Sequence, residues 1–175
     1  MKLVQSFFVC LMFLFGSLAH AESLSDYRVS SGDLIQIQVF GEDALSIETR
    51  LSDAGTISFP FLGELKIQDM TTGEVTDMLT AKLKDGYLLD PSVNVTVKEY
   101  REFYIHGQVE KPGAYPYQPG LTVQKAAALA GGFTERASES KMFITHDGQS
   151  TPPLKAALGT VVQPGDVIMI EESFF

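Results

Sequence analysis

The chain has 175 residues, a formal net charge of −9 and a single cysteine, Cys10. An acidic chain without a visible basic patch repels phosphates, which excludes nucleic acid as a partner. One cysteine close to the N-terminus excludes a disulfide scaffold and a cysteine metal site in the remainder, and the length predicts one or two small domains.

Residues 1–21 are predicted to form a cleaved signal peptide. Lys2 precedes an apolar run of about a dozen residues, and Ala19-His20-Ala21 has the small-x-small pattern of a cleavage site. The run is shorter than the roughly 20 residues that a membrane-spanning helix needs. Cys10 lies inside this run rather than after it, so we expect no lipidation. The mature chain is predicted to begin at Glu22 and to be periplasmic.

The first predicted elements are short strands. Residues 33–41 alternate, which places Ile35, Ile37 and Val39 on one face of a strand. Residues 51–67 predict a strand, a turn at Asp53-Ala54-Gly55, a second short strand, a bend from Pro60 to Gly63 and a third strand. This order is typical of a small sheet.

Residues 71–87 predict a helix. Thr71 and Glu74 have the spacing of a capping box, and Gly86 suits the C-terminal stop. The predicted apolar stripe consists of Val75, Met78, Leu79 and Leu83. Residues 91–100 then predict a strand with three valines on one side, and we expect the join between two domains near Tyr100-Arg101.

The second half repeats this order. Residues 103–109 predict a strand, residues 110–120 are rich in turn signals, and residues 121–133 predict a short helix capped by Thr122 and closed by Gly131-Gly132. Residues 142–148 and 167–172 predict two more strands. A helix packed on a small sheet in each half predicts an α+β fold of two domains, residues 22–100 and 101–175.

Two similar phrases open strands near the two ends of the chain, SGDLIQIQVF at residues 31–40 and PGDVIMIEES at residues 164–173. Asp33 and Asp166 could be read as a catalytic carboxylate pair. A glycine followed by an aspartate also fixes a tight turn, because the carboxylate accepts hydrogen bonds from nearby backbone amides. The phrases fall in different predicted domains, so we expect architectural aspartates that need not meet.

The search for other chemistry is negative. The sequence has no nucleophile elbow, no zinc-protease motif and no phosphate-binding loop. His106 and His146 fall in separate predicted strands, where a histidine is usually a surface residue or a satisfied polar group. Tyr115 and Tyr117 could stack on sugar rings, although covering the core of a small domain is the favoured interpretation. We expect no enzyme activity, no cofactor and no metal.

The residues and motifs resemble a known family. Residues 27–40, 51–67 and 90–97, with the helix that begins at Thr71, resemble the export domain of the outer-membrane polysaccharide export (OPX) family. Residues 103–133 resemble its soluble-ligand-binding β-grasp (SLBB) module. The family often carries glycine where Asp69 stands. The positions that we expect to be structural are Gly32, Asp33, Asp53, Gly55, Pro60, Gly63, Gly107, Pro112, Gly113, Gly131, Gly132, Gly165 and Asp166.

The resemblance implies a transport component rather than a catalyst. It implies a homo-oligomeric ring around a polysaccharide conduit, which works with an inner-membrane polysaccharide copolymerase. Because the sequence shows neither a lipidation motif nor a C-terminal amphipathic helix, we expect a periplasmic ring or adaptor under a separate outer-membrane β-barrel. The alternatives are a saccharide-binding or regulatory subunit without a conduit, and a polysaccharide-modifying enzyme, which would need two carboxylates in one cleft.

Overall fold

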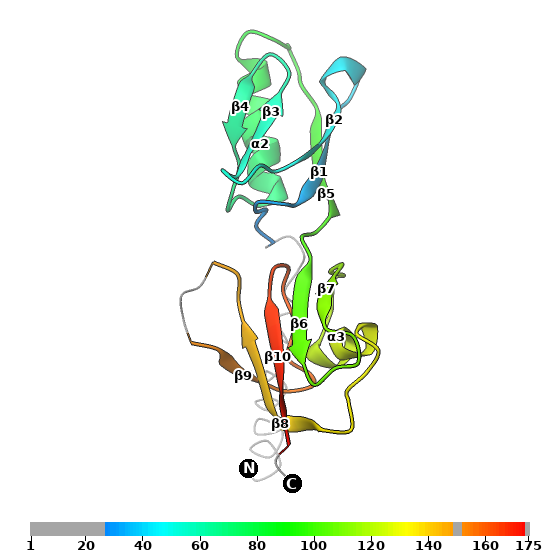
Figure 1. Cartoon of the computed structure of the whole chain (residues 1–175). Coiled ribbons are helices and arrows are strands. Elements are labelled where there is room, and N and C mark those ends of the chain that lie inside the picture. The colour runs from blue at the N-terminus through cyan, green and yellow to red at the C-terminus, as the bar shows by residue number, and fades with distance from the viewer. Residues whose placement is uncertain (1–26, 149–151, 174–175) are drawn as a thin grey trace, which may run out of the picture.

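The computed structural model describes residues 27–148 and 152–173. The predicted signal peptide, its cleavage site and Cys10 lie outside the described residues. Figure 1 shows two units stacked end to end, which are joined by the chain between the strand that ends at Glu99 and the strand that begins at Phe103. We call residues 27–100 the N-terminal unit and the described residues from Arg101 onward the C-terminal unit. Each unit has its own cluster of buried apolar side chains.

The N-terminal unit contains a three-stranded antiparallel sheet and a separate hairpin. In the sheet, β1 (Leu34–Val39) lies between β2 (Ile47–Arg50) and β5 (Val93–Glu99), and the 3-10 helix η3 (Asp43–Leu45) joins β1 to β2. The hairpin pairs β3 (Thr56–Phe59) with β4 (Gly63–Lys66). The alternation predicted for the first strand is confirmed, because Ile35, Ile37 and Val39 are all buried.

Helix α2 (Thr72–Lys84) packs against β5 of this unit. The predicted capping box is confirmed: the Thr71 side chain accepts from the Glu74 backbone N–H, and the Glu74 side chain accepts from the Thr71 backbone N–H. Val75, Leu79 and Leu83 are buried, as the predicted stripe requires. Just before the helix, Asp69 has a φ of 64°, a left-handed conformation that glycine adopts freely and aspartate tolerates.

The C-terminal unit is a five-stranded sheet covered by one helix. The strand order is β7-β6-β10-β8-β9, and β6 and β10 are parallel whereas the other neighbours are antiparallel. Helix α3 begins after the N-cap Thr122, as predicted, and buries Val123, Ala126 and Ala127 in the core, whereas Leu129 is exposed. The bounds are β6 (Phe103–Gly107), β7 (Gly113–Tyr115), α3 (Val123–Leu129), β8 (Ala137–Thr145), β9 (Leu154–Ala156) and β10 (Val167–Glu172).

The structure confirms the α+β fold and corrects several element bounds. The strand predicted from residue 51 is β2, which already ends at Arg50, and the strand predicted over 103–109 ends at Gly107. The strand predicted from residue 142 begins at Ala137, where a polar stretch joins the sheet. Two short strands, β7 and β9, were not predicted, because they lie in segments that are rich in turn residues. Both lie at the edges of the sheet, where short strands are common.

Candidate functional site

The first Gly-Asp phrase forms a closed turn at the start of β1. Asp33 is fully buried, and its Oδ2 accepts from the Ser30 backbone N–H at 2.8 Å. The Asp33 N–H donates back to the Ser30 carbonyl at 3.1 Å, and Gly32 has a φ of 91°. Glycine adopts this left-handed conformation without the steric cost of a Cβ. The carboxylate of Asp33 therefore closes its own turn.

The second phrase repeats the device at the start of β10. Asp166 is also fully buried, and its Oδ2 accepts from the Gln163 backbone N–H at 2.6 Å. The Asp166 N–H donates back to the Gln163 carbonyl at 3.2 Å. Its other carboxylate oxygen lies 2.9 Å from Nδ1 of His146. His146 follows β8 directly instead of lying inside a strand, and it is a satisfied polar group.

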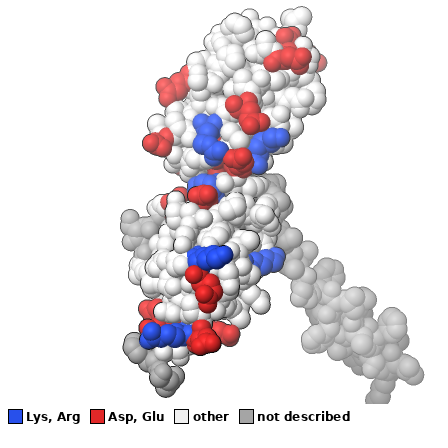
Figure 2. Space-filling view, turned by 45° about the vertical axis from the view of Figure 1, so that its right-hand side comes forward, with Lys and Arg blue, Asp and Glu red and all other residues white. Residues whose placement is uncertain are grey.

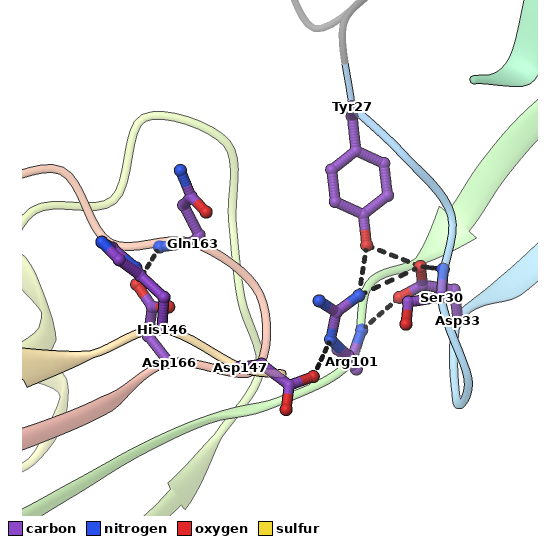
Figure 3. Close-up of polar contacts among 8 residues, drawn as sticks. All are labelled: Tyr27, Ser30, Asp33, Arg101, His146, Asp147, Gln163 and Asp166. Carbon is purple, nitrogen blue, oxygen red and sulfur yellow. Dashed lines mark hydrogen bonds and ion pairs between the residues drawn. The ribbon is translucent and has the colours of Figure 1, made fainter. Parts of the chain in front are cut away.

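Arg101 connects the two units. Its backbone N–H donates to Asp33 Oδ1 at 2.9 Å, and its guanidinium Nη1 donates to the Tyr27 hydroxyl at 3.0 Å and lies 3.6 Å from Asp33 Oδ2. On the other side, Arg101 Nε lies 3.1 Å from Asp147 Oδ2, an ion pair without a hydrogen bond. Figure 3 shows the guanidinium between the Asp33 turn and Asp147. We call Tyr27, Asp33, Arg101 and Asp147 the Arg101 junction.

Three tyrosines pack edge to face beside the Arg101 junction. Tyr27 and Tyr100 have ring centroids 4.9 Å apart, and Tyr100 and Tyr117 have centroids 5.3 Å apart. Such contacts contribute about 0.5–1.5 kcal/mol each beyond the area that they bury. Because Tyr27 belongs to the N-terminal unit and Tyr117 to the C-terminal unit, the stack adds an apolar link to the polar one.

Burial and hydrogen bonding change the pKa values of groups in and near the Arg101 junction. Burial, with the hydrogen bond to Asp33 as the next cause, raises the pKa of the Tyr27 hydroxyl, which therefore stays a donor. Burial also raises the pKa of Asp166, against the opposing effects of the Gln163 N–H, His146 and Arg101. Arg101 thus acts electrostatically on the second aspartate as well as the first.

The arrangement suits structural support rather than acid–base chemistry. A substrate cannot reach either carboxylate, because Asp33 and Asp166 are both 0% exposed. Their oxygens are directed at backbone amides, a tyrosine hydroxyl and a histidine, as Figure 3 shows. Among the described residues, no group of three His, Cys, Asp or Glu side chains is placed to hold a metal ion.

The expected structural positions fall into three places. The first comprises the two Gly-Asp turns. The second is the β3–β4 hairpin and the turn before it, where the Gly55 carbonyl accepts from the N–H groups of Ile67 and Gln68. In the third, the segment after β6 meets the end of α3: the Glu110 N–H donates to Gly132 and the Lys111 N–H to Ala130.

The two tyrosines considered for sugar contact are half-buried and pack on the C-terminal core. The Tyr115 ring stacks on Phe103 with centroids 6.0 Å apart, and its hydroxyl donates to the Lys111 carbonyl at 2.6 Å. Tyr117 contacts Tyr100 in the junction stack. Contact between either ring and a saccharide stays a prediction, and these packing contacts favour the core-covering interpretation.

Sequence reasoning missed several members of the Arg101 junction. Tyr27, Arg101 and Asp147 carry no motif, and their partners lie far away along the chain or across the domain join. The signal that was available is the position of Arg101, a charged residue at the predicted join. Figure 2 shows acidic and basic side chains interspersed on the visible face.

Both units match known protein-family models. Residues 21–98 match the family model for polysaccharide biosynthesis/export protein, and residues 103–154 match the SLBB domain. Within the described residues, no helix is both long enough and apolar enough to cross a bilayer.

Three curated relatives are similar to this chain. The exopolysaccharide production protein ExoF of Rhizobium meliloti is 34% identical over 139 residues, which cover 73% of this chain and 32% of that protein. The EPS I polysaccharide export outer membrane protein EpsA of Ralstonia nicotianae is 26% identical, over 83% of this chain and 47% of that protein. The polysialic acid transport protein KpsD of Escherichia coli is 26% identical, over 51% of this chain and 16% of that protein. The chain therefore spans less than half of each relative.

Proposed function

We propose that this chain, which belongs to the polysaccharide biosynthesis/export protein family and carries an SLBB domain, is a periplasmic component of a capsule or exopolysaccharide export translocon. It forms or caps a passive conduit for the polymer. The conduit lies between an inner-membrane polysaccharide copolymerase and a separate outer-membrane porin. The chain reaches the outer membrane through its partners.

The observation that carries the proposal is the combination of an export domain and an SLBB domain that the Arg101 junction holds end to end. A subunit of a conduit must keep a fixed shape, because neighbouring subunits have to present a continuous wall to the polymer. Two domains on a free hinge do not meet this need. The charge-assisted contacts of Arg101 with the buried Asp33 do, since they restrict how one unit can move relative to the other.

The proposed conduit is passive. Asp33 and Asp166 are both inaccessible, and the charge of the chain is strongly negative. A hydrated, acidic wall binds a hydroxyl-rich polymer weakly, and weak contacts allow the polymer to move along without stalling. Transport therefore needs no chemical step on this chain, and the driving force comes from the partners.

Deletion and complementation in the polymer-producing cell test the role in export. Without the gene, we expect the polymer to disappear from the cell surface and to accumulate inside the envelope, and the wild-type gene should restore secretion. Continued secretion by the deletion strain at the wild-type level would overturn the proposal. Fractionation and mass spectrometry of the exported protein test its periplasmic location and the predicted cleavage before Glu22.

Light scattering after size exclusion separates the conduit from the alternative function. A ring, or an assembly that grows with concentration, is expected for a conduit subunit. A monomer at all concentrations, with secretion still dependent on the gene, would favour a saccharide-binding or regulatory subunit without a conduit. A measurable hydrolytic or transferase activity on the polymer would instead favour the enzyme class.

A further inference from the structure

One open cavity of about 660 Å³ lies on the outer face of the C-terminal sheet. Its lining residues come from β6, β7 and β10 and are Tyr104, Ile105, His106, Gly113, Ala114 and Val167. The alternation along β6 explains the position, because Phe103 and Ile105 are buried in the core whereas Tyr104 and His106 are exposed on the opposite face.

The register of the sheet leaves the Tyr104 ring accessible. Ala114 of β7 lies directly opposite Tyr104 on one side, and Val167 of β10 lies opposite it on the other. These side chains are too small to cover an aromatic ring, and the Tyr104 residue is 50% exposed. Tyr115 differs, because its ring stacks on Phe103 and its hydroxyl is already bonded.

The lining around this ring is largely apolar, and hydrogen-bonding groups lie at its border. His106 follows Tyr104 by two residues, which places it about 7 Å further along the same face of the strand. The strand β7 lies at the edge of the sheet, so its outer backbone groups are open to a ligand. An apolar ring face with hydroxyl, imidazole and backbone groups at its border suits a pyranose, which has an apolar C–H face and hydroxyls at its rim.

We propose that this surface, which we call the Tyr104 platform, binds uncharged sugar rings of the exported polymer, with Tyr104 as the stacking residue and His106 as a hydrogen-bonding residue. No Asp, Glu, Lys or Arg lines the cavity, so recognition of a charged sugar substituent is not favoured. The inference rests on the proposed export function and adds the contact through which the C-terminal unit meets its substrate.

A protein partner fits this surface less well. A stable protein interface buries about 800 Å² on each side and centres on several large apolar anchors. The lining offers two large apolar side chains that are substantially exposed, Tyr104 at 50% and Val167 at 37%. A sugar ring needs no larger surface, and an open cavity allows a long polymer to pass over it with weak contacts.

Titration with sugar fragments tests the Tyr104 platform. The probe is a set of oligosaccharides released by partial hydrolysis of the polymer that the producing cells secrete. We expect amide shifts in β6, β7 and the start of β10 on NMR titration of the full mature chain, and Tyr104→Ala should weaken binding about tenfold. His106→Ala should weaken it less, and Tyr104→Phe should retain the stacking.

The chain offers a matched control. Tyr87 in the N-terminal unit is 52% exposed, and Tyr87→Ala should leave binding unchanged. Circular dichroism checks that the variants fold, and Tyr104→Phe supplies a folded comparison if Tyr104→Ala does not. No shifts with wild-type protein, or equal affinity in Tyr104→Ala, would overturn the inference.

Two further outcomes identify the source of a failure. If Tyr104→Ala changes the oligomeric state in light scattering, the surface is a subunit interface and the inference is wrong. If the wild-type gene restores polymer secretion but the protein shows no sugar shifts, the proposed export function stands and the Tyr104 platform alone fails. If the protein binds the sugars but secretion does not depend on it, the Tyr104 platform stands and the proposed export function fails.

Discussion

At the scale of single residues, Asp33 is held by three donors and one cation. The Tyr27 hydroxyl, the Ser30 N–H and the Arg101 N–H all point at its carboxylate, and the Arg101 guanidinium lies beside it. In Asp33→Asn an amide donor replaces one acceptor oxygen, so at least one buried donor loses its partner. We expect a loss of about 1–3 kcal/mol in the free energy of unfolding, measured by urea denaturation.

Asp53 provides the control for this substitution. Asp53 also lies in a turn before a strand, but it is exposed. Asp53→Asn should therefore change the free energy of unfolding by less than about 0.5 kcal/mol. Equal effects of the two substitutions would show that burial and the Arg101 contacts of Asp33 are unimportant. A change in any chemical rate is not expected.

Asp166 should give the protein a measurable dependence of stability on pH. Burial raises its pKa in the folded state above the ordinary value of 3.8. Between the unfolded-state and folded-state pKa values, the native protein binds more protons at this group than the unfolded chain does. The contribution of Asp166 to the free energy of unfolding is therefore complete at low pH and is lost as the pH rises through the folded-state pKa. Urea unfolding of wild type and Asp166→Asn at several pH values measures this difference.

We expect the wild type to lose stability relative to Asp166→Asn as the pH rises above 3.8 and through the raised folded-state pKa of Asp166. Glu74 has the opposite effect, because the Thr71 backbone N–H lowers its pKa and its contribution is lost as the pH falls. Since Glu74 is present in both proteins, its effect cancels in the comparison. A stability difference that stays constant or grows with pH would contradict the prediction.

At the scale of elements, Gly107 controls how closely β6 and β10 approach. It has a φ of 90°, and a Cβ at this position would overlap the backbone carbonyl oxygen of Ile170. Both strands would have to separate, although they form the parallel pair at the centre of the sheet. We expect Gly107→Ala to destabilise the protein by about 3 kcal/mol or more, measured by urea denaturation.

Gly120 is a control that shows the cost of left-handed backbone strain without an overlap between the new Cβ and a neighbouring strand. Its φ of 77° is similar, but a Cβ there would meet nothing within 4 Å. Gly120→Ala should therefore cost only about 1–2 kcal/mol of left-handed strain. If both substitutions cost the same, the overlap with Ile170 has no energetic consequence and the strands yield easily.

Sequence periodicity predicts the interior of these elements better than their connections. Ile35, Ile37 and Val39 are buried because strand alternation is a local property, and the Thr71 capping box needs only a spacing of three residues. The short edge strands β7 and β9 were missed because three residues carry too little pattern. The role of each aspartate in its own turn was predicted, but its distant partners were not. Arg101 is 68 residues from Asp33, and no local rule pairs them.

At the scale of the whole molecule, the Arg101 junction should determine how rigidly the two units are joined. The Arg101 side chain is 20% exposed and contacts Tyr27 and Asp33 on one side and Asp147 on the other. Arg101→Ala keeps the backbone bond to Asp33 but removes every guanidinium contact. We expect a loss of about 1–3 kcal/mol. We also expect a broader distribution of particle shapes in small-angle X-ray scattering and faster amide exchange in the two Gly-Asp turns.

Arg136 is the matched control, because it also forms an ion pair, with Glu172, but its side chain is 72% exposed. An exposed pair contributes about 0–1 kcal/mol, so Arg136→Ala should leave scattering and exchange unchanged. If Arg101→Ala behaves in the same way, the edge-to-face stack of Tyr27, Tyr100 and Tyr117 is sufficient to hold the units together. In that case the rigid wall that a conduit needs depends on the aromatic link rather than the ionic one, and Tyr100→Ala should then produce the flexible particle.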